Sequence, residues 1–159
     1  PAFTVTKDNK VEIRTVSKDE SRENFRIAMA GFSIILKNKQ VVIKYKDYHP
    51  RTCYGISDDG RYLYLMTVDG RQNLSKGVSL SALADDGRQK RISEGASVVE
   101  CAEFMRYFGA ADAINMDGGG STTLVNWNAS EQKAEILSHQ AFGDQRSVAT
   151  SLGIIRKNK

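Results

Sequence analysis

Three consecutive glycines follow a short apolar segment, with acidic and hydroxyl side chains on either side. The segment reads Asn115-Met116-Asp117-Gly118-Gly119-Gly120-Ser121-Thr122. Because glycine costs stability, such a run is expected where the backbone approaches another group closely or adopts positive φ. Successive N–H groups in such a turn form a concavity that binds anions, and Asp117 adds a carboxylate at its mouth. A tight structural turn is the alternative, and the run taken alone favours it.

Arginines stand beside other strand-end or turn motifs. The three segments are Pro50-Arg51-Thr52, Val68-Asp69-Gly70-Arg71-Gln72 and Asp144-Gln145-Arg146-Ser147. A planar guanidinium can hold a phosphate through two hydrogen bonds, which makes Arg51, Arg71 and Arg146 candidate phosphate ligands. Taken singly, each is typical of an exposed arginine, and Asp69 with Arg71 is typical of a surface ion pair.

The other reactive residue types predict no further site. His49 and His139 are expected to be loop or strand-end residues rather than bases, because neither has an identifiable charge partner. The two cysteines, Cys53 and Cys101, lack metal-ligand spacing. We expect two buried thiols in preference to a disulfide, and no metal site.

The chain has 159 residues and a formal net charge of +4, with a mean hydropathy of -0.43. These values are typical of one globular domain and suit an anionic partner. Nucleic acid is not expected as that partner, because the basic residues are scattered among acidic ones. No apolar run approaches the roughly 20 residues of a spanning helix, and no signal-peptide pattern is present.

Short strands are the predicted elements that position these residues. Two hairpins are expected, joining 32–36 to 41–44 and 52–56 to 61–68. Further strands are predicted at 11–16, 113–116, 122–127, 134–138 and 148–155. One helix is predicted over 97–108, because Ser97 and Glu100 have capping-box spacing and Gly109 is a natural stop. The predicted class is α+β: a mixed or antiparallel sheet of several short strands, with one main helix packed on it.

A short internal repeat precedes the predicted helix. Asp69-Gly70-Arg71-Gln72 recurs as Asp86-Gly87-Arg88-Gln89, and each copy is followed by Ser-x-Gly-x-Ser. No strand precedes the second copy, so we predict an inserted surface loop near 74–91. Residues 1–24 are charge-rich and are predicted to be an N-terminal segment or edge strand, ahead of a domain at 25–159.

In their order along the chain, these motifs resemble the phosphodiester glycosidase family. The resemblance extends over about residues 27–155 and is most specific at Asp117-Gly118-Gly119-Gly120-Ser121. The family usually carries an upstream Gly-Gly-Phe-Phe-like motif that residues 1–30 lack, since Met29-Ala30-Gly31-Phe32 is more similar to a later hairpin. The chain therefore resembles the C-terminal portion of the family's domain. Two explanations are left open: a separate upstream chain or segment completes the domain, or the protein is a reduced relative of the family.

The resemblance implies hydrolysis of sugar-1-phosphodiesters, such as those of N-acetylglucosamine, at the glycosidic C–O bond. Free sugar and a phosphomonoester would be released. Arg51, Arg71 and Arg146 would then clamp the phosphate, assisted by the backbone of Gly118, Gly119 and Gly120. Asp69 and Asp117 would be the catalytic carboxylates, and Asn115, Ser121 and Thr122 would orient sugar hydroxyls or carboxylates. Because phosphate is a good leaving group, the demand for a strong general acid is low.

The same resemblance implies an exported protein of the bacterial envelope or periplasm. No cofactor is required, although a divalent cation near Asp117 stays open. Two other functions remain: a non-catalytic glycan- or phosphate-binding domain of the envelope, and a metal-dependent phosphodiesterase that cleaves P–O. The lack of the upstream motif favours the binding domain, whereas the set of Asp and Arg residues favours the glycosidase.

Overall fold

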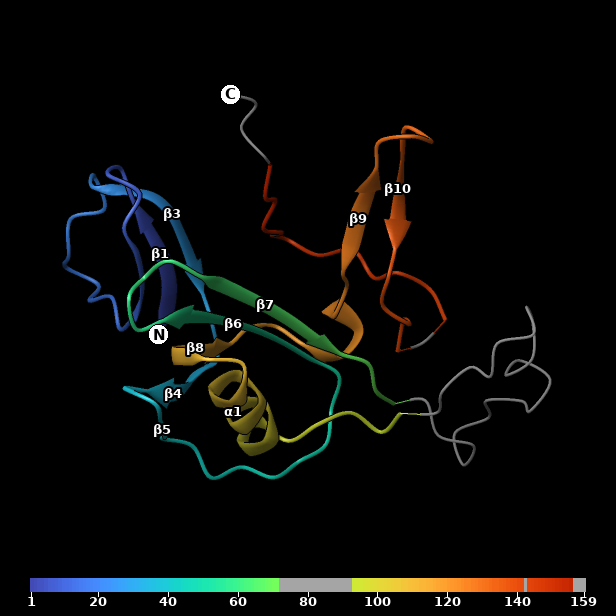
Figure 1. Ribbon diagram of the computed structural model, residues 1–159, viewed down its shortest axis with the longest axis horizontal. Helices are drawn as coiled ribbons and strands as arrows, with labels where there is room; N and C mark the ends of the chain where they lie inside the picture. Colours follow the sequence, from blue (N-terminus) through green and yellow to red (C-terminus); the bar gives the residue numbers. More distant parts are fainter. Residues whose placement is uncertain (72–92, 142, 156–159) are drawn as a thin grey trace.

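The computed structural model describes residues 1–71, 93–141 and 143–155. Within these residues the strands form three antiparallel sheets, and one α-helix accompanies them (Figure 1). The strand orders are β5-β4-β8-β6-β7, β2-β1-β3 and β10-β9. The α+β class is confirmed, but the expectation of one main sheet has to be corrected to three.

The five-stranded sheet contains both predicted hairpins. Its strands are β4 (Ser33–Lys37), β5 (Gln40–Val41), β6 (Arg51–Ser57), β7 (Leu63–Val68) and β8 (Ala110–Asn115). The β4–β5 turn has positive φ at Asn38 (49°) and Lys39 (64°), as in tight hairpin turns. β5 ends at Val41 and is shorter than the predicted 41–44 segment. β8 lies between β4 and β6, so the end of β8 is at the centre of the sheet.

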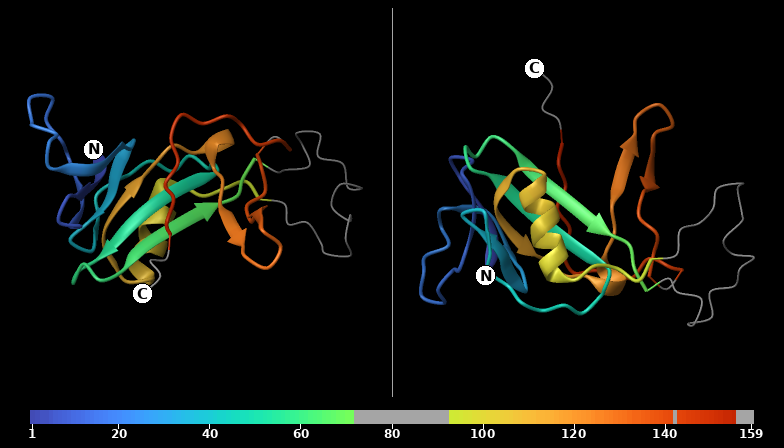
Figure 2. Two further views of the ribbon diagram at one scale, coloured as in Figure 1. Left: turned by 90° about the horizontal axis from the view of Figure 1, so that it is seen from above. Right: turned by 60° about the horizontal axis from the view of Figure 1, so that its bottom comes forward.

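The helix α1 (Val98–Tyr107) begins at the predicted capping box. The hydroxyl of Ser97 accepts the backbone N–H of Glu100, and the Glu100 carboxylate accepts the backbone N–H of Ser97. Its buried face, which includes Cys101, Ala102 and Met105, packs on the five-stranded sheet (Figure 2). Gly109 follows with φ of 103°, which allows the chain to turn directly into β8.

The three-stranded sheet is formed by β1 (Ala2–Thr6), β2 (Val11–Arg14) and β3 (Phe25–Ala30). The sequence predicted only the strand at 11–16 here, and β1 is the central strand. β1 pairs with β3 across the predicted division at residue 24, which itself stays a prediction. The buried side chains of Phe3 and Tyr54 meet edge to face, with ring centroids 5.3 Å apart, and join this sheet to β6.

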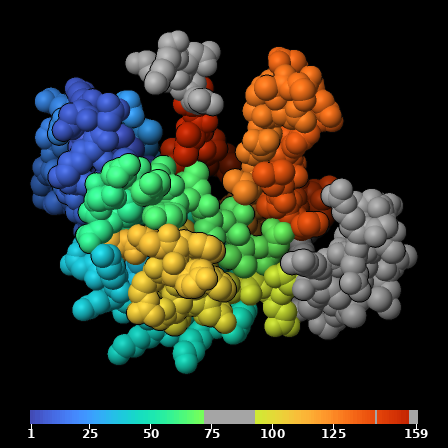
Figure 3. All heavy atoms as spheres, viewed as in Figure 1, coloured from blue at the N-terminus to red at the C-terminus, as the bar shows by residue number. Residues whose placement is uncertain are grey.

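The C-terminal part contains the 3₁₀ helix η3 (Gly119–Ser121) and the strands β9 (Val125–Asn128) and β10 (Lys133–Ile136). The β9–β10 hairpin stands out from the rest of the molecule (Figure 3). The predicted strand at 122–127 starts late because η3 takes up the residues before Thr122. The predicted inserted loop near 74–91 lies outside the described residues.

The strand predicted at 148–155 is wrong. The structure describes these residues and assigns them to no strand, and the side chains of Val148, Ile154 and Ile155 are exposed. The β-branched residues of this segment favour an extended backbone, but a strand also needs a partner strand with free hydrogen-bonding groups. None of the helices in the described ranges is long and apolar enough to cross a membrane.

Candidate active site

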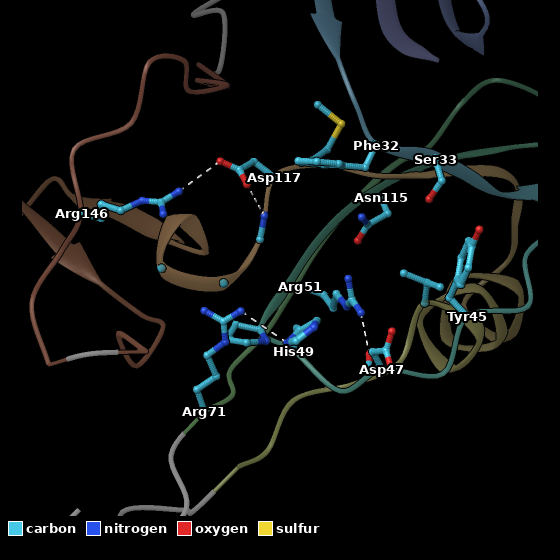
Figure 4. A pocket seen from close by; sticks show the side chains of 16 residues that line it. Phe32, Ser33, Tyr45, Asp47, His49, Arg51, Arg71, Asn115, Asp117 and Arg146 are labelled. Atoms are coloured by element: carbon cyan, nitrogen blue, oxygen red, sulfur yellow. Dashed lines mark hydrogen bonds and ion pairs between the residues drawn. The ribbon is translucent and has the colours of Figure 1, made fainter. Parts of the chain in front are cut away.

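A cavity of about 570 Å³ lies at the ends of β6 and β8, next to the triple-glycine turn (Figure 4). Most of the residues predicted for the site line it: Arg51, Arg71, Asn115, Asp117, Gly118, Gly119, Gly120 and Arg146. They come from sequence positions almost a hundred residues apart. The pairing of β6 with β8 brings the first and the middle of these motifs together, because Cys53 and Asn115 are register partners.

The triple-glycine turn is packed against the start of β6. The N–H of Met116 donates to the carbonyl of Thr52 at 2.8 Å, and that of Gly119 donates to the carbonyl of Pro50 at 2.9 Å. A Cβ on Gly118 would lie 2.6 Å from the same Pro50 carbonyl oxygen. Glycine is therefore required here because two backbone segments meet.

This packing changes the role expected of the glycine amides. The N–H of Gly118 donates to Oδ1 of Asp117 at 2.9 Å, and the N–H of Gly119 is bonded to Pro50. These two N–H groups are used within the chain, so they do not form the predicted anion-binding concavity in this structure. Cationic side chains are then the main candidates for holding an anion.

Asp117 is oriented by neighbours on both of its oxygens. Besides the Gly118 contact, Oδ2 accepts the hydroxyl of Ser121 at 2.8 Å and lies 3.4 Å from Nη2 of Arg146. Arg146 also contacts Ser121. The carboxylate is 61% exposed, so it faces the open cavity while its orientation is held by hydrogen bonds. Ser121 does not line the cavity but contacts Asp117.

Arg71 approaches the same turn from the end of β7. Its guanidinium lies beside Gly119, where an added Cβ would be 3.0 Å from Nη1, and Nη2 is 3.4 Å from Nδ1 of His49. Arg71 has φ of 58°, an unfavourable conformation for a residue with a side chain. The backbone N–H of Arg71 donates to the backbone carbonyl of Glu94 at 3.3 Å, which helps to hold this conformation.

The first repeat copy lies against the Ser-x-Gly-x-Ser segment that follows the second copy. Asp69-Gly70-Arg71 packs on Ser93-Glu94-Gly95, and the Ser93 hydroxyl donates to the Asp69 carbonyl at 2.6 Å. A Cβ on Gly95 would lie 2.3 Å from the carbonyl of His49. Motifs that are far apart in the sequence thus make close contacts here.

Arg51 lines the cavity, but its donors are partly used elsewhere. Nε donates to the carbonyl of Ala96 at 3.0 Å, and Nη2 donates to the carbonyl of Asp47 at 2.6 Å. These bonds tie β6 to the segment before α1 and to the 42–48 loop. Arg51 therefore positions the walls of the cavity.

Two other predicted residues lie outside the cavity lining. Asp69 pairs with His139, whose Nδ1 is 3.0 Å from Oδ2, so His139 has the charge partner that the sequence did not reveal. Thr122 is 2% exposed, and its hydroxyl has no hydrogen-bond partner among the described residues. Neither residue reaches the carboxylate of Asp117 through any contact that the structure shows.

The structure adds cavity residues that were not predicted for the site: Phe32, Ser33, Tyr45, Asp47 and His49, of which only His49 was considered from the sequence, as a loop residue. His49 directly precedes Pro50-Arg51-Thr52, so its position in that motif was the available signal. Tyr45 and Asp47 belong to a charge-rich loop without periodicity, and no sequence signal pointed to them.

The two cysteines lie behind the cavity wall and are buried and free, as expected. The Cys53 thiol donates to Oδ1 of Asn115 at 3.8 Å. Its hydrogen bond with Cys101, together with burial, raises the pKa of Cys53 well above the usual range of a thiol. The same hydrogen bond lowers the pKa of Cys101. Cys53 therefore acts as a packing residue and a weak donor. Among the described residues, no cluster of three His, Cys, Asp or Glu side chains could hold a metal ion.

A sequence profile of the phosphodiester glycosidase family matches residues 1–85 and 83–155. The chain belongs to the phosphodiester glycosidase family. The match begins at the first residue, upstream of the motifs that carried the resemblance, and each part contains one copy of Asp-Gly-Arg-Gln. No curated protein matches this family member.

One solved structure with a similar fold is that of the zebrafish N-acetylglucosamine-1-phosphodiester alpha-N-acetylglucosaminidase catalytic domain, auto-inhibited by its pro-peptide. The two chains are 22% identical, with a TM-score of 0.57. The alignment covers 77% of this phosphodiester glycosidase family member and 40% of the zebrafish chain. The chain thus spans less than half the length of that relative, and the likeness concerns the fold.

Proposed function

We propose that this protein hydrolyses sugar-1-phosphodiesters at the glycosidic C–O bond and releases free sugar and a phosphomonoester. The observation that supports this most is that the Asp117 carboxylate and the cationic side chains of Arg71 and Arg146 line the same open cavity. An anionic diester next to an anomeric carbon needs both kinds of group.

In this proposal, Arg71 and Arg146 bind the phosphate oxygens. They stabilise the negative charge that stays on the phosphate when the C1–O bond breaks and its electron pair leaves with oxygen. Asp117 supplies negative charge next to the anomeric carbon, which becomes positive in the transition state. Water then provides the new oxygen on C1, and its proton is released.

The proposal assigns the chemistry to Asp117 rather than to Asp69. Asp69 is engaged by His139 and does not line the cavity. Asp117 has the Gly118 N–H and the Ser121 hydroxyl to hold its oxygens, an arrangement that fixes the orientation of the carboxylate. Asn115, 5% exposed at the cavity wall, is proposed to orient the sugar or the carboxylate.

The test is turnover of an N-acetylglucosamine-1-phosphodiester by the protein and its Asp117→Asn variant. The variant keeps the size of the side chain and removes its charge, so kcat is expected to fall by about 100-fold or more. Asp58→Asn is the matched control, because Asp58 lies on the exposed β6–β7 turn, where it pairs with Lys39 of the β4–β5 turn. Full activity of Asp117→Asn would refute the assignment.

The bond that breaks is tested separately by hydrolysis in ¹⁸O-labelled water. Label in the sugar supports C–O cleavage, whereas label in the phosphate would establish the alternative P–O cleavage. The proposal also includes that no cofactor is needed, so turnover should persist after treatment with a chelator. Export to the envelope or periplasm belongs to the same proposal and is tested by cell fractionation.

A binding domain without turnover is the second candidate. It is favoured by residues 1–30, which lack the Gly-Gly-Phe-Phe-like motif that is usual in the family. Binding of the phosphodiester by the wild-type protein without cleavage would support this candidate over hydrolysis.

A further inference from the structure

Two aromatic side chains line the cavity without a role in the proposed bond cleavage. Phe32 is 71% exposed and Tyr45 is 70% exposed. In Figure 4 they lie at one end of the cavity with Ser33 and Asp47, whereas Arg71 and Arg146 lie at the other end. Large exposed aromatic rings at a concave site are typical of a surface that binds a ligand.

Phe32 is held in place by the sheet. Its backbone N–H donates to the carbonyl of Asn115 at 2.9 Å. The residue before it, Gly31, is in such close contact with the sheet that an added Cβ would lie 2.6 Å from Cδ1 of Ile114. The ring therefore extends from a rigid backbone directly beside Asn115.

Tyr45 lies in the 42–48 loop, which is anchored at Asp47 and at Tyr48. Arg51 donates to the Asp47 carbonyl at 2.6 Å, and the Tyr48 hydroxyl donates to Oε1 of Glu100 on α1 at 3.1 Å. These contacts fix the loop at the cavity edge, although they leave the Tyr45 ring exposed.

We propose that Phe32 and Tyr45 form the sugar-binding end of the cavity, so that the substrate lies with its pyranose ring toward them and its phosphate toward Arg71 and Arg146. This inference rests on the proposed function. The C–H face of a pyranose is weakly positive and packs well on the negative face of an aromatic ring. Asp117 lies between the two ends in Figure 4, where this orientation places the scissile C1–O bond.

The polar residues at the same end suit the hydroxyls of a sugar. Ser33 and Asn115 offer neutral hydrogen-bonding groups, and Asp47 adds a carboxylate that accepts hydroxyl hydrogen bonds. Arg51, which donates to the Asp47 carbonyl, adds a cation beside this carboxylate. The ligand that these groups suit is therefore a pyranose with free hydroxyls.

The experiment measures binding of two separate probes, N-acetylglucosamine and inorganic phosphate, to the protein and its variants by NMR titration. Tyr45→Ala and Phe32→Ala should each weaken sugar binding by about fivefold to tenfold and leave phosphate binding unchanged. Arg71→Ala should do the reverse. Tyr45→Phe keeps the ring and should keep sugar affinity, and Tyr107→Ala, at an 85% exposed site on α1, is the matched control.

Sugar affinity that is unchanged in both alanine variants would overturn the inference, as would an equal loss of sugar and phosphate binding in variants that remain folded. The turnover assay separates this outcome from failure of the proposed function. Sugar binding that depends on Tyr45 without any turnover would contradict hydrolysis and support the sugar-binding end. Turnover with an unchanged KM in Tyr45→Ala would support hydrolysis and contradict the sugar-binding end.

Discussion

At the scale of single residues, two glycines near the cavity are explained by contacts between backbones. Gly118 lies on the carbonyl of Pro50, and Gly95 lies on that of His49. Both contacts bring motifs that are distant in sequence to the cavity. A glycine-rich run that suggested a phosphate-binding loop thus serves to pack the loop that carries Asp117 onto β6.

Gly118→Ala is predicted to destabilise the protein by about 1–3 kcal/mol, because its Cβ would meet a backbone oxygen that cannot move aside like a side chain. Urea denaturation measures the change. Gly153→Ala is the control, since a Cβ there meets nothing within 4 Å, and its effect should be within about 0.5 kcal/mol. Equal stability of the two variants would refute the close contact.

At the scale of elements, α1 is the part that local sequence rules describe best. Its first turn satisfies its free N–H groups with the Ser97 and Glu100 side chains, and Glu100 also accepts the Tyr48 hydroxyl of the 42–48 loop. The hydrogen bonds from the Ser97 backbone and hydroxyl lower the pKa of Glu100 below its ordinary value. The helix start and the loop next to the cavity are thereby linked through one carboxylate.

This link predicts a pH dependence of stability. The pKa of Glu100 is 4.5 in the unfolded chain and lower in the folded protein. The ionised carboxylate therefore makes its full contribution to stability at pH values above 4.5, and this contribution is lost as the pH falls through the folded pKa. Glu100→Gln should therefore be less stable than the wild type at pH 7, and the difference should close toward about pH 3. Urea denaturation across this range measures it.

Glu103→Gln is the control for the pH series. Glu103 lies on the same helix and is 46% exposed. It forms a surface ion pair with Arg106, and such pairs contribute little to stability. Its stability difference should be smaller than that of Glu100→Gln at pH 7. A Glu100→Gln difference that does not change with pH would contradict the assigned role.

At the scale of the whole molecule, the three-stranded sheet and the five-stranded sheet share a core. The buried cluster of Phe3, Val5, Ile13, Tyr54, Ile114 and Met116 draws residues from both. Ile114 and Met116 immediately flank the cavity residue Asn115 and lead into Asp117. The N-terminal residues therefore support the segment that carries the candidate catalytic carboxylate.

Phe3→Ala is predicted to destabilise the protein by about 3–5 kcal/mol, because Phe3 is 1% exposed and packs on Tyr54. Urea unfolding of the wild type should show one transition by both far-ultraviolet circular dichroism and tyrosine absorbance. Val42→Ala, at a 52% exposed site, is the control with little expected effect. Two separate transitions, with only one shifted in Phe3→Ala, would show that the two sheets do not unfold together.

Local rules were sufficient for the elements whose signals are local. Side-chain hydrogen bonds cap α1 at Ser97, and turn residues define the β4–β5 and β6–β7 hairpins, so neighbouring residues determine these elements. The same rules failed at 148–155, where apolar β-branched residues have no partner strand. They also missed β1, whose pairing with β3 joins residues that lie 19 to 28 positions apart.

The sequence alone was also sufficient for the family and for much of the cavity, because Asp117, Arg71 and Arg146 belong to motifs with strong local character. Only the tertiary structure decided how these residues act together. The β6–β8 pairing and the glycine contacts place Asp117 and Arg71 in one cavity, whereas Asp69 is directed toward His139. It also placed Phe32 and Tyr45 there, since long-range strand pairing and loop anchoring leave no pattern among neighbouring residues.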